Sequence, residues 1–324
     1  MGSGSGGTVP VIAGNRNGVK GGNGHRSAVA PMPRLEGAVV VAEPPGDGPG
    51  YWAGAPSAVL ADGVYYLAYR LRRPIGKGRG FATVVARSED GERFEPLLVV
   101  DKDEFGAESL ERPALAIAPD GGWRLYMSCA TPGTLHWRVD VLEAANPAGF
   151  DPARRRTVLP GNEATAVKDP VIVWAGGRWH LWASCHPLAV PADADQMVTA
   201  YATSADGLDW SWHGTALTGR QGSWDARGVR ITSVLLNGYR SVAYYDGRAS
   251  AAENFEERTG LAAGTGPGAF RQMDRQPLGS PHGAGGLRYL SMVRLPDGGH
   301  RLYYEATRQD GAHELRTEYL ALST

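Results

Sequence analysis

The sequence predicts an all-β fold, a five-bladed β-propeller over residues 35–324 that follows a flexible, Gly-rich tail over residues 1–34. Three observations lead to this prediction. A three-part pattern recurs about every 58 residues from Trp52 onward, a period that marks propellers or solenoids. Each copy contains a tight-turn sequence between two apolar strands. Helical periodicity is nearly absent, so short strands and Gly, Pro and Asp turns account for most of the chain.

Each copy begins with a short apolar run, which we expect to be the innermost strand of a blade. The runs are residues 55–60, 112–117, 169–174, 229–234 and 288–293. A turn follows each run, built from residues that accept the positive φ angles of tight hairpins. The turns are Asp62-Gly63, Asp120-Gly121-Gly122, Gly176-Gly177, Asn237-Gly238 and Asp297-Gly298-Gly299.

An aromatic strand comes next in every copy, and a third strand follows after a variable loop. The aromatic strands are residues 65–69, 123–127, 179–182, 239–244 and 300–304. Residues 88–94 and 204–210 repeat the same Ser-x-Asp-Gly hairpin two copies apart. Five copies predict five blades.

The apolar run at residues 37–42 has no partner within its own copy. We expect it to form the outer strand of the last blade. Such pairing would join the two ends of the ring and leave no open sheet edge there.

The charge composition excludes several classes of partner. The chain has 33 basic and 34 acidic side chains, so it carries no surplus charge to attract nucleic acid or anionic lipid. No apolar stretch approaches the roughly 20 residues of a membrane span, and the Gly-rich N-terminal segment lacks the apolar core of a signal peptide. We therefore expect a cytoplasmic protein without nucleic acid or membrane partners.

The two cysteines, Cys129 and Cys185, end apolar runs at equivalent places in successive copies. We expect buried free thiols, with a disulfide between them as the alternative. No zinc-binding spacing of Cys and His occurs, so no cofactor is expected. A structural calcium ion on the channel axis stays open as an alternative.

Charged residues converge on the predicted channel, because the first strand of each blade lines it. An unpaired buried charge costs several kcal/mol, so a cluster of charges here favours a functional site over a purely structural one. The residues at these positions are Trp52, Glu111, Arg112, Lys168, Asp169, Trp224, Asp225 and Arg230.

The segments Glu111-Arg112-Pro113 and Lys168-Asp169-Pro170 resemble the channel strands of glycoside hydrolase family 43 and its relatives in families 32, 68 and 130. The resemblance implies three channel carboxylates. Asp169 matches the one that orients the substrate, and Asp225 or Glu257 would be the general acid. Ala55 stands where the resemblance requires an aspartate base, so a standard inverting mechanism is not implied.

The long loop at residues 245–260 is the second functional candidate, with Asp246, Glu253, Glu257 and Arg258. A solvated helical turn with Glu253 and Glu257 at i,i+4 spacing is the alternative. Four arginines are candidates for holding a carboxylate or phosphate group of the substrate: Arg112, Arg230, Arg258 and Arg73. In the alternative, each arginine only neutralises a neighbouring carboxylate, for example Glu111 with Arg230.

Two histidines and two tryptophans complete the candidate site. His186 and His282 are candidate proton carriers, with surface positions as the alternative. Trp52 and Trp224 are candidates for stacking on a sugar ring, with packing between blades as the alternative.

Together these residues predict a glycoside hydrolase-like enzyme that binds a small sugar or glycoside and uses carboxylate acid/base catalysis. An anionic sugar or glycoside is one option for this ligand. Asp169, Asp225, Glu257 and Glu111 are the expected catalytic residues. Two alternatives remain. One is a repurposed propeller enzyme, such as a phosphorylase, lyase or cyclase, and the other is a non-catalytic propeller that binds a glycan or a protein.

Overall fold

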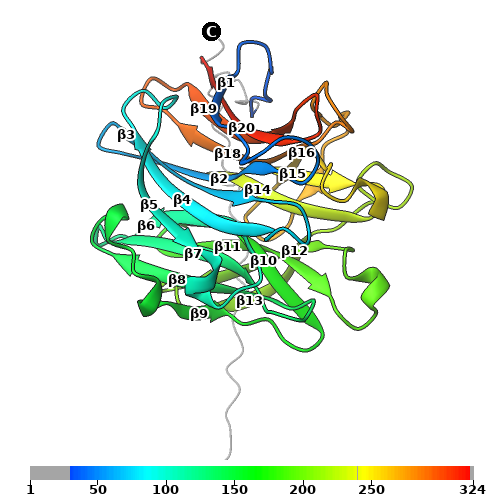
Figure 1. Ribbon diagram of the computed structural model, residues 1–324, viewed down its shortest axis with the longest axis horizontal. Helices are drawn as coiled ribbons and strands as arrows, with labels where there is room; N and C mark the ends of the chain where they lie inside the picture. The colour runs from blue at the N-terminus through cyan, green and yellow to red at the C-terminus, as the bar shows by residue number, and fades with distance from the viewer. Residues whose placement is uncertain (1–29, 239, 322–324) are drawn as a thin grey trace, which may run out of the picture. The chain divides into compact units, whose positions relative to one another are not determined.

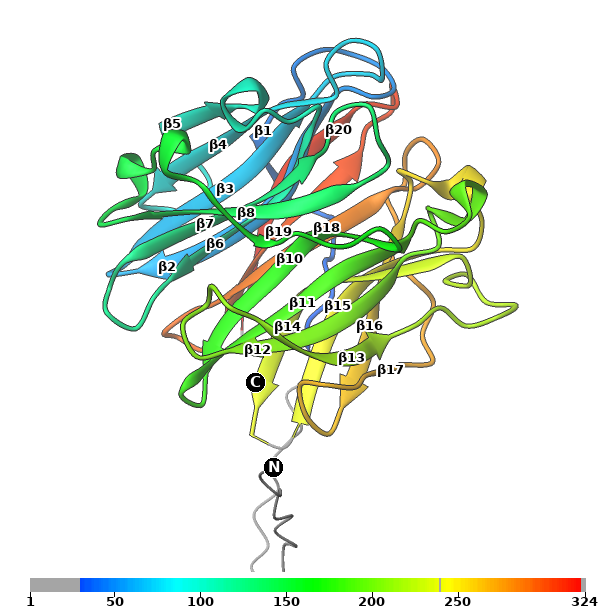
Figure 2. The same ribbon diagram turned by 90° about the horizontal axis from the view of Figure 1, so that it is seen from below.

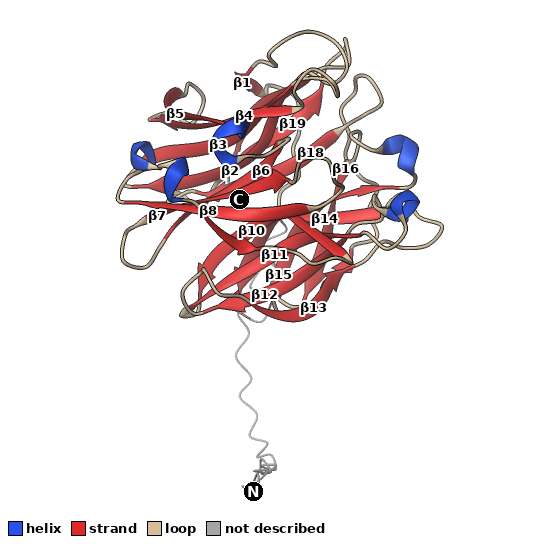
Figure 3. Ribbon diagram, turned by 60° about the horizontal axis from the view of Figure 1, so that its bottom comes forward, coloured by secondary structure: helices blue, strands red, loops and turns tan. Residues whose placement is uncertain are grey.

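The computed structural model describes residues 30–238 and 240–321, and these residues form an all-β structure (Figure 3). Within them lie twenty strands and five single-turn 3₁₀ helices. The helices are Lys102–Phe105, Pro147–Gly149, Pro152–Arg154, Pro191–Asp193 and Ala251–Glu253. The predicted tail falls mostly outside the described residues, as do Tyr239 of the fourth aromatic strand and residues 322–324.

Three four-stranded sheets follow one another along the chain, each with its strands in sequence order. Sheet 2 consists of β6 (Leu110–Ile117), β7 (Trp123–Ala130), β8 (Trp137–Ala144) and β9 (Arg156–Leu159). Sheet 3 consists of β10 (Thr165–Ala175), β11 (Arg178–Pro187), β12 (Val198–Ser204) and β13 (Ser211–Leu217). Sheet 4 consists of β14 (Gly228–Asn237), β15 (Arg240–Arg248), β16 (Arg258–Gly264) and β17 (Arg271–Gln272). Figure 2 shows sheets 3 and 4, in green and yellow, side by side.

An eight-stranded sheet contains both ends of the repeat region. Its first half, sheet 1, consists of β2 (Trp52–Ala61), β3 (Val64–Arg72), β4 (Gly80–Ser88) and β5 (Glu95–Asp101). Its second half, sheet 5, consists of β18 (Leu287–Arg294), β19 (His300–Thr307), β20 (His313–Leu320) and β1 (Val39–Ala42). A parallel bridge between Trp52 and His313 joins the two halves.

The strand β1 pairs with β20, as the sequence predicted for residues 37–42. The pairing is antiparallel, with Val39 opposite Thr317, and Figure 1 shows the blue β1 beside the red β20. The outer edge of the last sheet is therefore covered by a strand from the other end of the chain.

The first strands of the five sheets form a closed series of contacts. β2 contacts β6, β6 contacts β10, β10 contacts β14, β14 contacts β18, and β18 contacts β2 again. The hydrophobic cores lie between neighbouring sheets rather than inside one of them. One core joins Val85 of sheet 1 to Leu125 of sheet 2, and another joins Val141 of sheet 2 to Leu181 of sheet 3. This arrangement brings the charged ends of the inner strands together.

Both cysteines are free thiols, so the disulfide alternative does not hold. Cys129 is buried as expected, whereas Cys185 is only half-buried. The helices in the described part of the chain are too short and polar to cross a membrane.

Candidate functional site

All five inner strands carry an irregularity in their pairing at the same level. It lies between Gly54 and Ser57 in β2, and at corresponding positions in β6, β10, β14 and β18. Ala55, Asp169 and Tyr289 adopt φ angles of 53°, 52° and 56° there, a left-handed conformation that is uncommon for residues other than glycine. Bulges of this kind redirect side chains. Here they surround a cavity with the residues Glu111, Lys168, Arg230 and Arg288, each from a different inner strand.

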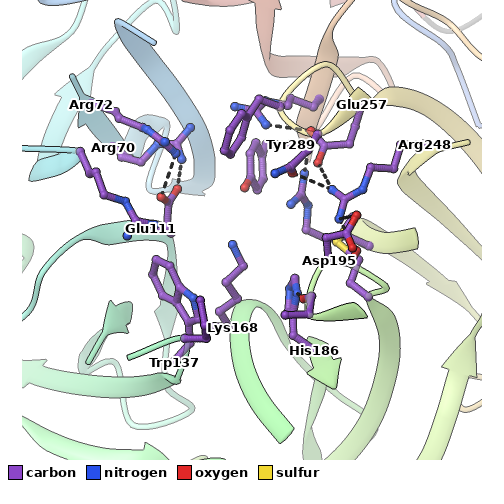
Figure 4. Close-up of a pocket in the computed structure, with 18 of the residues that line it drawn as sticks. Arg70, Arg72, Glu111, Trp137, Lys168, His186, Asp195, Arg248, Glu257 and Tyr289 are labelled. Carbon is purple, nitrogen blue, oxygen red and sulfur yellow. Dashed lines mark hydrogen bonds and ion pairs between the residues drawn. The ribbon is translucent and has the colours of Figure 1, made fainter. Parts of the chain in front are cut away.

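The cavity has a volume of about 270 Å³, and its lining is rich in charge (Figure 4). Seven cationic side chains face it: Arg70, Arg72, Arg79, Lys168, Arg230, Arg248 and Arg288. Three carboxylates accompany them: Glu111, Asp195 and Glu257. Trp137, Phe255 and Tyr289 supply aromatic surface.

Glu111 forms one wall of the cavity together with two arginines from β3. Its carboxylate accepts hydrogen bonds from Arg70 and, at 3.2 Å, from Nη1 of Arg72. Arg230 was the neutralising partner predicted as an alternative, but Arg70 and Arg72 of β3 are the partners instead. Arg72 is held in turn by the faces of Trp52 and Phe255, at 4.0 and 4.8 Å.

Glu257 forms the opposite wall (Figure 4). It accepts hydrogen bonds from Arg248 Nη1 at 2.6 Å and Arg288 Nη1 at 2.8 Å, and Arg230 Nη2 lies 3.9 Å away. Burial opposes ionisation, yet these guanidinium groups hold the pKa of Glu257 well below its usual range. Glu257 is therefore a carboxylate at neutral pH, which does not suit the role of general acid expected for it.

Asp169 is fully buried and contacts two of the cations that line the cavity. Its Oδ2 lies 3.3 Å from Arg230 Nη1 and 3.6 Å from Lys168 Nζ. Burial alone would raise the pKa of Asp169, but Lys168 and Arg230 hold it below its usual value. Asp169 thus orients two cavity-lining cations and does not line the cavity itself. Asp246, also buried, binds Arg230 at 2.8 Å, and burial raises the pKa of Asp246 to about 6.

Lys168 and His186 lie on the side of the cavity that Trp137 borders (Figure 4). Lys168 Nζ lies 4.6 Å from the centre of the Trp137 ring, and burial lowers the pKa of Lys168 to about 8. His186 Nδ1 donates a hydrogen bond to the carbonyl of Ala194 at 2.8 Å. Burial and the nearby Lys168 lower the pKa of His186 to about 3, so its ring is neutral. The Nε2 atom of His186 is then a free acceptor, with no partner among the described residues.

The structure also shows what occupies the space next to Ala55, where the family resemblance requires an aspartate. A Cβ atom on Gly54 would lie 2.1 Å from Oε2 of Glu305, so the carboxyl group of Glu305 occupies the space of a side chain at position 54. Glu305 accepts hydrogen bonds at 2.8 Å from each of Arg70, Arg288 and His313. It is fully buried and does not line the cavity, so it does not replace the missing base.

Several other predicted residues lie away from the cavity. Asp225 is buried against Arg220 and Tyr245, and Trp224 stacks on Tyr245 at 5.4 Å. Trp52 is buried and stacks on His313 at 4.9 Å, behind the cavity wall.

The remaining predicted residues do not line the cavity either. Arg112 is buried beneath the cavity and donates to the carbonyl of Thr232 at 2.5 Å. Glu253 pairs with Arg258 at 3.3 Å, and His282 is exposed beside a different surface hollow.

Five of the seven cavity cations were not predicted from the sequence: Arg70, Arg72, Arg79, Arg248 and Arg288. Arg70 and Arg72 lie at the end of β3, and Arg248 lies at the end of β15. These three arginines lie within a few residues of the end of a predicted aromatic strand, and a search of the strand ends that face the channel would have found them. No three His, Cys, Asp or Glu side chains within residues 30–238 and 240–321 converge in a way that would hold a metal ion.

No family model and no curated protein matches the sequence. The fold, however, is similar to those of several solved structures. The chain is similar to a thermostable family-43 glycoside hydrolase, with a TM-score of 0.66, 13% identity, and coverage of 88% of this chain and 93% of that one. An α-L-arabinofuranosidase from Lactobacillus brevis gives a TM-score of 0.63 and 16% identity, with 82% and 90% covered. A β-1,2-mannobiose phosphorylase from Listeria innocua gives 0.61 and 14%, with 90% and 92% covered.

The predicted resemblance to the propeller glycoside hydrolases is therefore confirmed at the level of the fold.

Proposed function

We propose that residues 35–324 form a five-bladed β-propeller enzyme that acts on a sugar or glycoside in the central cavity. Sheets 1 to 5 would be the five blades, since their first strands contact one another in a closed series. The shared fold with glycoside hydrolases and a mannobiose phosphorylase supports a glycan as the substrate class.

The observation that carries the proposal is the presence of two carboxylates on opposite walls of one cavity, Glu111 and Glu257 (Figure 4). Glycosidic bonds are cleaved between such groups, one of which accepts a proton or attacks the sugar. Arginines keep Glu257 ionised, so it fits the acceptor or nucleophile. Glu111 on the facing wall fits stabilisation of the positive charge that develops on the sugar ring.

The leaving oxygen needs a proton donor, and Lys168 is the group placed to supply it. Its ammonium lines the cavity and has a pKa of about 8, close to neutrality. In hydrolysis, Lys168 would give its proton to the leaving oxygen as the glycosidic carbon–oxygen bond breaks. Water would add to the sugar carbon and lose its proton to Glu257. Asp169 would position Lys168 and Arg230 from behind.

The test is turnover of a panel of aryl glycosides and oligosaccharides by the wild type and by Glu257→Gln. Loss of a proton acceptor or nucleophile is expected to lower kcat by about 10²–10⁴-fold. Glu143→Gln is the matched control, because Glu143 is a half-exposed carboxylate on β8 that pairs with Arg124 away from the cavity. Melting curves check that each variant is folded.

An inactive wild type on every glycoside would contradict the proposal and favour a non-catalytic glycan-binding propeller. Full activity in folded Glu257→Gln would remove Glu257 from the mechanism.

A further inference from the structure

The cavity contains more positive than negative charge. Its lining has seven cationic side chains against three carboxylates. The layer directly behind it adds three carboxylates, Asp169, Asp246 and Glu305, but also the guanidinium of Arg112. The cluster therefore keeps two more cations than anions within a region largely screened from water.

Lys168 and Arg72 are the lining cations with the weakest compensation. The carboxylate oxygen nearest to Lys168 Nζ in the described chain belongs to Asp169, at 3.6 Å, which is too long for a hydrogen bond. Arg72 makes one hydrogen bond, at 3.2 Å, to a carboxylate that Arg70 also holds. The side chains of Lys168 and Arg72 are 14% and 3% exposed, so water compensates them only in part.

Burying such cations is unfavourable unless a counter-charge is present. Burial lowers the pKa of Lys168, and burial together with Arg70 and Arg288 lowers the pKa of Arg72. Both shifts have the direction expected for cations that lack an anion. A bound anion would stabilise the charged form of each.

The same cavity also presents features that suit a neutral sugar. His186 Nε2 is a buried acceptor without a partner among the described residues, and it can accept a hydrogen bond from a hydroxyl group but not from an oxyanion. Trp137 offers an aromatic face beside Lys168. Acceptor, aromatic face and surplus cations lie within one cavity.

We propose that the ligand of this cavity combines a sugar with an oxyanion, a phosphate or a carboxylate, and that Lys168 and Arg72 hold the oxyanion. The inference rests on the proposed function for the sugar and adds the acidic group. Two sources supply the same chemistry: an acidic substituent on the sugar itself, or inorganic phosphate bound beside a neutral sugar.

Calorimetric titration tests the inference without requiring turnover. The probes are a hexuronate, a hexose 6-phosphate, the matching neutral hexose, and inorganic phosphate with and without that hexose. The wild type is expected to bind at least one oxyanion-bearing probe about tenfold more tightly than the neutral hexose. That preference should weaken as salt concentration rises.

Lys168→Gln and Arg72→Gln are each expected to reduce the preference about tenfold, whereas Lys168→Arg should retain it. Arg178→Gln is the matched control, because Arg178 is an exposed cation at the opposite end of the same sheet and should leave binding unchanged. Two independent variants are used so that a folding defect in one does not decide the result. Preference for acidic sugars would identify a substituent, and binding of inorganic phosphate alone would identify a separate anion; both support an oxyanion site.

Equal affinity for neutral and acidic probes, unchanged in folded Lys168→Gln and Arg72→Gln, would overturn the inference. The two proposals fail separately. Oxyanion preference without any cleavage would contradict the enzyme but keep the binding site, whereas cleavage of neutral glycosides without oxyanion preference would do the reverse.

Discussion

At the scale of single residues, the site depends on a glycine at position 54, which leaves room for a buried carboxylate. Gly54 lies next to Ala55 at the pairing irregularity of β2, and the carboxyl group of Glu305 occupies the space that a side chain at position 54 would need. Arg288 and Arg70 hold the pKa of Glu305 well below its usual range although burial opposes ionisation. A residue with no side chain thus allows a buried anion to fix two arginines of the cavity.

Gly54→Ala is therefore expected to disturb the cavity from behind. The added Cβ would lie 2.1 Å from Glu305 Oε2, so the carboxylate must move away from Arg70 and Arg288. Disrupting a buried ion pair costs about 3–5 kcal/mol, which denaturant unfolding would measure. Gly266→Ala is the control, since nothing lies within 4 Å of its Cβ position. Equal stability of the two variants would show that Glu305 moves at no cost.

The charge state of Lys168 sets a pH dependence for oxyanion binding. Its pKa of about 8 means that the ammonium is present below that pH and lost above it. A bound carboxylate favours the charged form, so affinity for a hexuronate should be full at pH 7 and about tenfold weaker at pH 9. The charged or titratable groups that face Lys168 are Arg70, Asp169, His186, Arg230 and Glu257.

Titration calorimetry at several pH values tests this dependence. A hexuronate is the suitable probe because its carboxylate stays ionised throughout. Lys168→Arg should remove the fall in affinity, because a guanidinium keeps its proton in this range. A fall of the same size in Lys168→Arg would assign the titration to another group.

At the scale of elements, the hairpins could be predicted and the far ends of the strands could not. Ser88 and Ser204 end β4 and β12, and the hydroxyl of each accepts a hydrogen bond from the glycine three residues later, at 2.8 Å. This local geometry needs no tertiary contact, so the repeated Ser-x-Asp-Gly sequence was sufficient to reveal it.

The cavity charges are a different case. In the sequence, the ends of β3 and β15 look like ordinary strand ends that face solvent. Only the closed arrangement of the sheets directs their arginines, Arg70, Arg72 and Arg248, into the cavity. Glu111, Lys168 and Arg230 could be predicted because the inner strands line the axis in any such arrangement. Asp225 could not be placed correctly, since β14 begins at Gly228 and leaves Asp225 in the preceding loop. The register of a strand decides which of its side chains point toward the channel. That register is set by pairing with neighbouring strands and not by the local sequence.

At the scale of the whole molecule, β1 covers the outer edge of the last sheet by pairing with β20. An uncovered outer strand would present free backbone groups to other chains. Glu318 of β20 strengthens the closure by accepting a hydrogen bond from the backbone N–H of Arg34 at 2.9 Å, while Tyr304 donates to the same carboxylate at 2.8 Å. The cavity is lined by four of the inner strands, β6, β10, β14 and β18, and the last of these belongs to the sheet that β1 completes.

Replacing residues 38–42 by a Gly/Ser segment of equal length is expected to uncover the outer edge of β20. The change removes the side chains of β1 and weakens its pairing, which should lower the free energy of unfolding by about 1–3 kcal/mol, given a net worth of about 1 kcal/mol per hydrogen bond. Denaturant unfolding measures that loss, and light scattering should show association through the uncovered edge of β20. The same replacement of residues 75–78, in the loop between β3 and β4, is the control. Unchanged stability and a monomeric state after the first replacement would show that the ring holds without β1, through the bridge between Trp52 and His313 and the contacts between inner strands.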